Sequence, residues 1–294
     1  MTRRLWLIFT VLVIFLVNTP STITANHLNA GEVIVDQYGF EMVYVPAGRV
    51  TMGIERGRLV QFIEQGAFLD VPESQVDLIL DIYEEQGAFE TIDIEVSEFW
   101  IDRYEVTIEQ YLSRAEYCMG TGRCNTLNLP PELMSDPNQP QVGIDWFDAL
   151  RFCVGRGARL ATEHEWEYAA SGSENLIFPW GNTLVYENIS IAVPTIGVTY
   201  PVGSKRENIS WVGAYDMAGN AAEWVEDRLL PYAFDSDLWA LWSSTPNFDT
   251  QRVMRGGSYY SSTALETTTF ARISRNSQSA SGGIRCVRSA NPNE

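Results

Sequence analysis

Histidine and lysine are nearly absent from this sequence of 294 residues. The only histidines are His27 and His164, and the only lysine is Lys205. Non-haem iron oxygenases bind their metal through a histidine-rich set of ligands, and this chain offers only His164 and His27 near its start, which argues against that class of enzyme. His164 falls within a helical pattern, where we expect it to pack or to face solvent. The remaining positive charges are arginines, and we infer no function from this preference.

Positive charge is scarce overall. The chain carries 20 lysines and arginines against 38 acidic residues, which gives a formal net charge of −18. Phosphate backbones and anionic membrane surfaces would be repelled by such a chain, whereas divalent cations and basic peptides would be attracted. We therefore expect no nucleic-acid partner.

Long apolar runs are absent after the first residues. Residues 1–25 combine Arg3 and Arg4 with an apolar stretch, Leu5 to Val17, and a polar segment that ends at Ala25. This layout predicts a secretory signal peptide, because the stretch is shorter than the roughly 20 residues of a bilayer span. An uncleaved anchor is the alternative. Cleavage would lower the positive count from 20 to 18, so the net charge of the secreted or periplasmic chain would become −20, with no stable membrane span.

Cysteine is limited to four residues, Cys118, Cys124, Cys153 and Cys286. An even number in an exported chain favours disulfides, and four cysteines allow three pairings. The short glycine-bearing loop between Cys118 and Cys124 favours a small ring, which leaves Cys153 with Cys286. A zinc site is the weaker alternative, because the spacing matches no common zinc pattern. For the small ring, we favour a structural bridge over one that cycles its redox state.

Short apolar segments alternate with turns in the first hundred residues. Residues 33–50 predict short strands broken at Gly39 and at 46–48, and residues 92–101 alternate as one strand. Between them, residues 55–90 have apolar residues at helical spacing and an acidic outer face, which predicts a helical insertion. We expect this insertion to pack on a single domain that covers residues 33–290.

Two capping boxes mark helix starts later in the chain. Thr107 with Gln110 predicts a helix to about residue 117, and Thr162 with Glu165 predicts another. A helix from residue 146 to the glycines near residue 155 lies between them. No internal repeat or separating linker is present.

Residues 215–224, YDMAGNAAEW, combine two carboxylates with a glycine turn. The side chains of Asp216 and Glu223 and the carbonyl groups of Gly219 and Ala221 are close enough in sequence to converge on one hard cation. Calcium accepts six to eight oxygen ligands, main-chain carbonyls included. In the alternative interpretation, the two carboxylates only cap backbone groups of a tight turn.

The sequence resembles the formylglycine-generating-enzyme family, also called the sulfatase-modifying-factor domain, from about Gly39 to Arg288. The resemblance rests on seven blocks in the order of the family: GFEMVYVPAGRVTMG, FWIDRYEVTIEQY, VGIDWFDALRFCVGRGARLATEHEWEYAASG, FPWGN, YDMAGNAAEWVED, RVMRGGSYY and GGIRCVR. It implies an irregular α+β fold related to C-type lectins, with little regular secondary structure and bound calcium.

The resemblance also implies roles for individual residues. It assigns a calcium to Asp216, Gly219, Ala221 and Glu223, and it implies the pairing of the cysteines at 153 and 286. A second calcium site of the family begins with an Asn-Ile pair, matched here by residues 188 and 189. The segment after that pair is shortened and lacks the later aspartate of the family, which argues against the second site. The residues predicted for this second calcium site are Asn188 and Ile189.

The family's catalytic cysteines are missing. Active members place two cysteines after the GGSY block to bind copper(I) and activate oxygen, but the corresponding positions hold Ser261 and Glu266. Soft copper(I) prefers thiolates, so we expect no copper and no formylglycine formation. An indole beside the family's substrate groove is replaced by Ala222. The remaining cleft candidates are Ser258, Tyr259 and Arg275.

Two functions remain open. The first is an exported, calcium-stabilised binding or accessory module with a protein or peptide partner. The second is a divergent oxidoreductase that oxidises a peptide cysteine or another peptide-like substrate. Glu266 could act there as a general base, although a solvated glutamate is the simpler interpretation. Sequons at Asn188 and Asn208 would matter only in a host that glycosylates secreted proteins.

Overall fold

The computed structural model describes residues 28–64, 74, 76–85, 89–114, 130–192, 197–229, 251–276 and 278–291. The expected leader and the expected Cys118–Cys124 ring lie outside these residues. Within the described ranges, no helix is both long enough and apolar enough to cross a bilayer.

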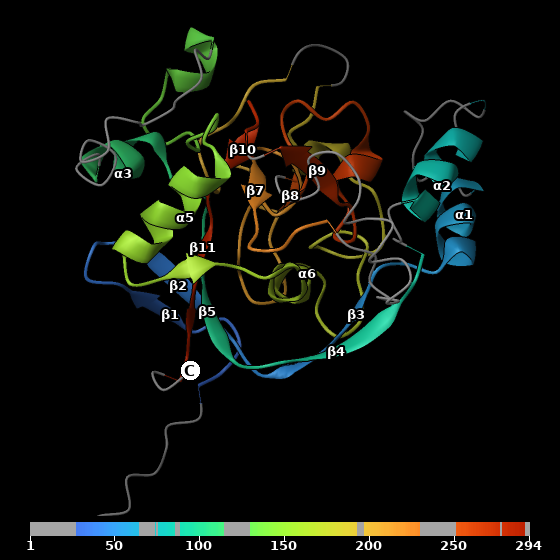
Figure 1. Ribbon diagram of the computed structural model, residues 1–294, viewed down its shortest axis with the longest axis horizontal. Helices are drawn as coiled ribbons and strands as arrows, with labels where there is room; N and C mark the ends of the chain where they lie inside the picture. The colour runs from blue at the N-terminus through green and yellow to red at the C-terminus, as the bar shows by residue number, and fades with distance from the viewer. Residues whose placement is uncertain are drawn as a thin grey trace, which may run out of the picture.

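A five-stranded antiparallel sheet lies at one end of the molecule (Figure 1). Its strand order is β1-β2-β5-β11-β6, so the C-terminal strand β11 sits between β5 and β6, which come much earlier in the chain. The bounds are β1 Val33–Val35, β2 Glu41–Val45, β5 Phe99–Asp102, β11 Cys286–Ser289 and β6 Arg159–Leu160.

A second sheet carries the segments that resemble the family's functional blocks. Its order is β10-β7-β8-β9, and only the β10–β7 pair is parallel. The bounds are β7 Ala222–Trp224, β8 Gln251–Arg255, β9 Ile273–Asn276 and β10 Gly282–Gly283. Because β8 leads into the RGGSYY block and β9 follows it, this sheet positions residues 256–272.

The expected single strand over residues 92–101 is wrong. The structure divides it into β4, Ile92–Val96, and β5, with a break at residues 97–98. Strand β4 pairs with β3, Gly48–Met52, in a separate two-stranded sheet, whereas β5 pairs with β2 and β11. The alternation of apolar residues marks extended backbone but does not show that the chain changes its partner strand partway along.

The expected helices are confirmed where the structure describes them, except that the helix after Thr107 ends at Ser113, with Arg114 as its C-cap, and not at about residue 117. Both predicted capping boxes form, at Thr107 with Gln110 and at Thr162 with Glu165. The α-helices are α1 Arg56–Glu64, α2 Val76–Glu85, α3 Ile108–Ser113, α5 Trp146–Gly155 and α6 Glu163–Ser171. Short 3-10 turns are η2 Pro131–Met134, η3 Tyr186–Asn188 and η5 Ala264–Thr267.

Helix α6 lies at the centre of the core. Its buried Trp166 and Ala169 pack with apolar residues of β2, β3, β5 and β8 in one cluster. A second cluster joins α5 to β7 and β8 and contains the Cys153–Cys286 disulfide, which confirms that predicted pairing. The bridge links α5 to β11, so it ties the helical layer to the first sheet.

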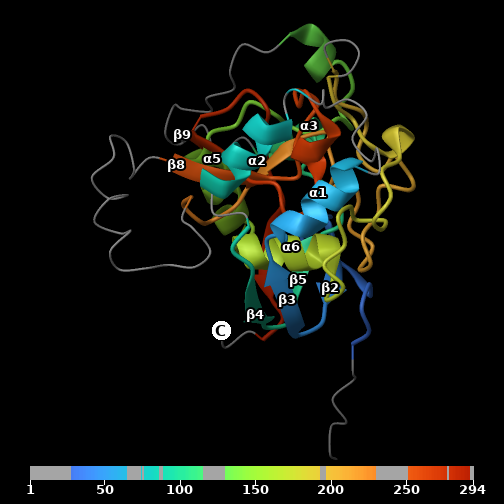
Figure 2. The same ribbon diagram turned by 90° about the vertical axis from the view of Figure 1, so that its right-hand side faces the viewer.

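The helical insertion packs on the second sheet's side of the molecule. Helices α1 and α2 lie opposite α3 and α5 in Figure 1 and face the viewer in Figure 2. Leu59, Leu80 and Tyr83 join a buried cluster with Leu265 and Phe270. The expected packing of the insertion on the domain is therefore confirmed for its described residues.

Buried arginines connect the elements through ion pairs. Arg156, fully buried at the end of α5, contacts Asp36 at 3.0 Å and Asp102 at 2.7 Å, and its guanidinium stacks over Phe40. The pKa of the Asp36 carboxyl lies below its usual value: burial opposes ionisation, but the Phe40 N–H group, Arg156 and the Tyr38 N–H group outweigh it. This ion pair therefore stabilises the folded state above the ordinary pKa of an aspartate.

We predict that Asp36→Asn destabilises the fold at pH 7 by roughly 2 kcal/mol, because Arg156 keeps Asp102 but loses one buried carboxylate. The lowered folded pKa means that the wild-type advantage is present above about pH 4 and disappears as the pH falls further. Urea unfolding of both proteins between pH 3 and pH 7 measures this difference.

Glu95→Gln is the matched control, because Glu95 forms an exposed pair with Arg49 that contributes little. A pH-independent difference between wild type and Asp36→Asn would contradict the proposed role of the Asp36 charge.

Candidate functional site

The RGGSYY block forms a tight turn after β8. Gly257 has a φ of +67°, and a Cβ atom there would lie 2.6 Å from the carbonyl oxygen of Glu266. Glycine is required at this position because the turn runs against η5 with no room for a side chain. The sequence block thus brings residues 258–261 close to residues 266–267.

Ser258 and Ser261 are both buried and are held within this turn. The Ser258 N–H group donates to Ser261 Oγ at 3.0 Å, and the Tyr260 N–H group donates to Ser258 Oγ at 3.1 Å. The N–H group of Ser261 donates back to the Ser258 carbonyl group at 2.9 Å. Ser261, at the position of the first family cysteine, is therefore a structural acceptor.

Glu266 forms a third capping box, which sequence reasoning missed. Its Oε1 accepts from the N–H groups of Ser262 and Thr263 at the start of η5 and from the Ser262 hydroxyl. The pattern Thr263-x-x-Glu266 is visible in the sequence and could have identified the box. Glu266 is therefore a positioned capping residue with one remaining oxygen, rather than a freely solvated glutamate.

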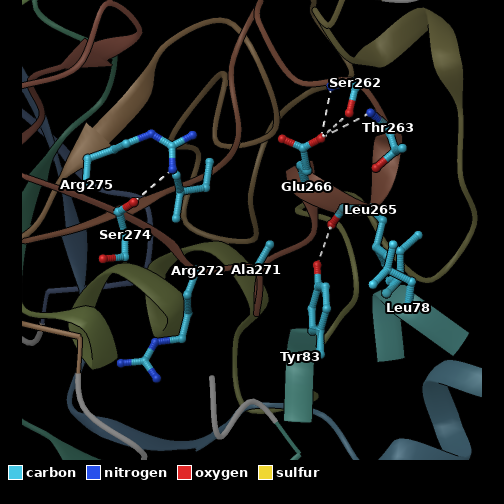
Figure 3. A pocket seen from close by; sticks show the side chains of 12 residues that line it. Leu78, Tyr83, Ser262, Thr263, Leu265, Glu266, Ala271, Arg272, Ser274 and Arg275 are labelled. Atoms are coloured by element: carbon cyan, nitrogen blue, oxygen red, sulfur yellow. Dashed lines mark hydrogen bonds between the residues drawn. The ribbon is translucent and has the colours of Figure 1, made fainter. Parts of the chain in front are cut away.

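A pocket of about 420 Å³ lies between α2 and the η5–β9 segment (Figure 3). Leu78, Ile79 and Tyr83 line it on the side of the insertion. The Tyr83 hydroxyl donates to the Leu265 carbonyl group at 3.2 Å, which fixes α2 against η5. Sequence reasoning missed these insertion residues, because helical periodicity does not show which surface a helix covers.

The five predicted cleft residues do not gather in one place. Glu266 and Arg275 both line the pocket, while Ser258, Ser261 and Tyr259 are not among its lining residues. The Tyr259 ring is buried beside Leu133 and Ala221, and burial, together with Tyr260, raises the pKa of its hydroxyl to about 12. Tyr259 is thus poorly suited to lose a proton near neutral pH.

Neighbouring Arg272 also borders the pocket, but its charge is already balanced. Its Nε and Nη2 atoms contact the two carboxylate oxygens of Glu163 at 2.8 and 2.6 Å. Arg255 approaches the same carboxylate at 3.0 Å and also pairs with the buried Glu167. These ion pairs fix α6 to β8 and to the start of β9.

A group of buried carboxylates surrounds the YDMAGNAAEW block. Glu223 is held by Arg285 through two contacts, at 2.8 and 2.7 Å, and accepts from Trp166 Nε1 at 2.6 Å. Glu105 accepts from the Ala221 N–H group at 2.7 Å and from the Asn220 side chain. Sequence reasoning missed Glu105, because no local motif links it to this block.

Asp216 completes the carboxylate group. Its φ of +60° is unusual for a residue other than glycine, and its Oδ2 accepts from the Gly203 N–H group at 2.5 Å. Burial raises the pKa of Asp216 to about 6, with Glu223 adding to the effect. Burial, Asp216 and Glu223 raise the pKa of Glu105 well above its usual value.

The predicted calcium ligands fit a cation only in part. The excess of buried negative charge and the Oδ1 atom of Asn208, which is buried without a hydrogen-bond partner among the described residues, suit a hard cation beside Asp216. Glu223 fits poorly, because Arg285 and Trp166 already occupy its two oxygens. In the part of the chain that the structure describes, no group of three or more Asp, Glu, His or Cys residues is arranged to hold a metal ion.

The residues of the second predicted calcium site lie next to the first. The Ser190 carbonyl group accepts from the Asn220 N–H group at 3.0 Å, and a Cβ atom on Gly219 would lie 2.6 Å from that same carbonyl oxygen. Asn188 and Ile189, which precede this contact, are buried. Asn208 is 1% exposed and donates to the Ala218 carbonyl group, so neither sequon asparagine is accessible in the fold.

Comparison with known proteins identifies a matching family. Residues 35–290 match the family described as the sulfatase-modifying factor enzyme 1-like domain. The chain is 32% identical over 177 residues to the formylglycine-generating enzyme of Streptomyces coelicolor, which covers 54% of this chain and 55% of that protein. It is 30% identical over 171 residues to the "Inactive C-alpha-formylglycine-generating enzyme 2" of Bos taurus, which covers 51% of this chain and 50% of that protein.

The matches reach only part of the curated relatives, since the chain spans between about a third and just over half of their length. Among solved structures, PvdO from Pseudomonas aeruginosa is similar with a TM-score of 0.58 and 20% identity. That similarity covers 89% of this chain and 99% of PvdO. It supports the irregular α+β fold that the sequence implies.

We predict that Ser261→Ala destabilises the protein by about 1–3 kcal/mol, because the buried Ser258 N–H group loses its acceptor. Glu266→Ala should cost about 1 kcal/mol through loss of the cap, whereas Glu266→Gln should be nearly neutral because glutamine can also cap. Chemical denaturation measures all three free energies. A neutral Ser261→Ala, or equal losses for the two Glu266 variants, would refute these capping roles.

Proposed function

The chain belongs to the sulfatase-modifying factor enzyme 1-like family, and from that membership we propose that it is an exported, calcium-stabilised binding or accessory module without copper-dependent formylglycine-generating activity. In this proposal the chain keeps the fold of the family, but its cleft no longer carries out the copper-dependent reaction. Its partner is a protein or peptide of the exported compartment.

The inferred loss of the copper reaction rests on one observation. The positions of the two family cysteines hold Ser261 and Glu266, and the Ser261 hydroxyl and one Glu266 oxygen are engaged in hydrogen bonds within local turns. A hydroxyl and a carboxylate are poor ligands for copper(I), which prefers thiolates. The cysteines of the described residues, Cys153 and Cys286, are joined in a disulfide that belongs to a different buried cluster from the residues of η5.

Similarity to relatives does not decide the question, because they include proteins named as formylglycine-generating enzymes and proteins named as inactive. The residues at the two cysteine positions carry more weight than overall identity, since the activity of the family depends on them. The alternative, a divergent oxidoreductase that acts on a peptide-like substrate, requires a redox centre of a different kind.

The calcium part of the proposal rests on the buried negative charge around Asp216. Asp216, the carbonyl groups of Gly219 and Ala221, and Asn208 Oδ1 are the oxygens that would hold the ion. A bound cation would offset the burial that raises the pKa of Asp216 and of Glu105. Glu223 would act through Arg285, by keeping that guanidinium in place.

We predict no formylglycine when the purified protein is incubated with a cysteine-containing sulfatase-type peptide, copper and oxygen, as followed by mass spectrometry. The wild-type protein should also bind no copper(I) in competition with a chelator. A double variant, Ser261→Cys with Glu266→Cys, is the matched control, because it restores two thiols at the family positions and should gain copper(I) affinity.

Conversion of the peptide by the wild-type protein would favour the oxidoreductase alternative. Equal copper(I) binding by wild type and double variant would contradict the reason given for the loss.

We predict that millimolar calcium raises the melting temperature and that a calcium chelator lowers it, because an ion that binds only the folded state stabilises it. Magnesium should have a smaller effect, since it demands a tighter octahedral site. Differential scanning calorimetry measures the shift. Asp216→Asn should abolish it, whereas Glu226→Gln, at an exposed position nearby in sequence, should retain it. Identical melting with calcium and with chelator would rule the site out.

A further inference from the structure

The pocket between α2 and the η5–β9 segment has the size of a small-molecule site. Its volume of about 420 Å³ falls in the range of roughly 300–1,000 Å³ typical of such sites. Leu78, Ile79 and Ile273 supply apolar surface from both sides. Leu78 is 60% exposed, so its side chain has apolar surface left for a ligand to cover.

Two opposite charges stand at this apolar surface. The Oε1 atom of Glu266 is used by the cap, but Oε2 has no hydrogen-bond partner in the described part of the chain. Arg275 makes one hydrogen bond, to the carbonyl group of the adjacent Ser274, and forms no ion pair with a described residue. Figure 3 draws both side chains, and no hydrogen bond joins the charged ends of Glu266 and Arg275.

Arg272 differs from Arg275, because the charge of Arg272 is already neutralised within the protein. Arg272 borders the same pocket, but both oxygens of Glu163 neutralise it. Of the pocket's charged residues, Glu266 and Arg275 therefore retain charge that can meet a ligand. A ligand with only a negative charge would be repelled by Glu266, and a ligand with only a positive charge would be repelled by Arg275. A molecule with both an amine and a carboxylate satisfies the two together.

We infer that this pocket binds a small zwitterion with an apolar body, of the kind given by a short apolar peptide with both termini free. The ligand's amine would contact Glu266 Oε2, its carboxylate would contact Arg275, and its apolar body would lie on Leu78 and Ile273. A segment inside a longer chain has no charged termini to offer, so it is disfavoured. This inference rests on the proposed binding role of the module.

The test uses dileucine and its blocked derivatives with the purified full chain, by isothermal titration calorimetry. Wild type should bind dileucine about tenfold more tightly than either N-acetyl-dileucine or dileucine amide, because each blocked form loses one charge-assisted contact. Free leucine and trileucine, measured in parallel, define the preferred length.

The two charge variants should change ligand preference in opposite directions, which a loss of folding would not do. Glu266→Gln keeps the cap but should no longer distinguish dileucine from its N-acetyl form, while still preferring it to the amide. Arg275→Gln should show the reverse preference. Arg49→Gln, an exposed arginine of β3 that does not line the pocket, should match wild type. Leu78→Asn should weaken all three ligands alike.

Absence of saturable dileucine binding by wild type up to millimolar concentration would overturn the inference, as would equal affinities for the free and blocked forms. These outcomes are independent of the copper and formylglycine measurements. A failure of the pocket assignment would therefore be distinguishable from a failure of the proposed function.

Discussion

Buried guanidinium groups hold this fold together. Arg285 is the central case: it binds Glu223 through two contacts and donates to the carbonyl groups of Asp102 and Tyr215, so it joins the first sheet, the second sheet and the loop between them. Removing such a group from water is costly, and the cost is offset only when every donor finds an acceptor. The planar fork of arginine can do this with several partners at once, whereas a lysine ammonium cannot. The scarcity of lysine in the sequence is consistent with that demand, although no function follows from it.

The same constraint determines what the family's functional blocks can do here. Asp216 and Glu105 belong to the ionic framework around Arg285, so the YDMAGNAAEW block primarily holds the sheets in register. The RGGSYY block adjoins that framework, because the Gly219 N–H group donates to the Gly256 carbonyl group at 2.7 Å and the Tyr259 N–H group donates to the Asn220 carbonyl group at 2.8 Å. Beyond these contacts, the chain leads on to the η5 side of the pocket. The serines of this block and Glu266 stabilise local turns through their own hydrogen bonds.

Local signals in the sequence identified much of this architecture. The capping boxes at Thr107 and Thr162, the strands near residue 40 and the helical insertion all depend on neighbouring residues. The Glu223–Arg285 pair was not predictable, because 62 residues separate its members and no local pattern joins them. The break between β4 and β5 was missed for a related reason, since strand partners are chosen by distant segments. Glu266 and Arg275 were among the predicted cleft residues, but the α2 side of the pocket was missed because no local pattern joins that helix to η5–β9.

Helix α2 supplies one side of the pocket but is separate from the ion pairs of Arg156, Arg255 and Arg285. A substitution at the exposed Leu78 would therefore leave the energetics of the interior largely untouched, whereas Tyr83 belongs to a buried cluster. Substitutions selected at exposed positions on this side of the pocket can alter ligand preference without a large change in the stability of the fold. Such a division lets one scaffold diversify its recognition surface, in the way that a stable framework tolerates variable loops. Divergence between chains that share these seven blocks should concentrate in the insertion.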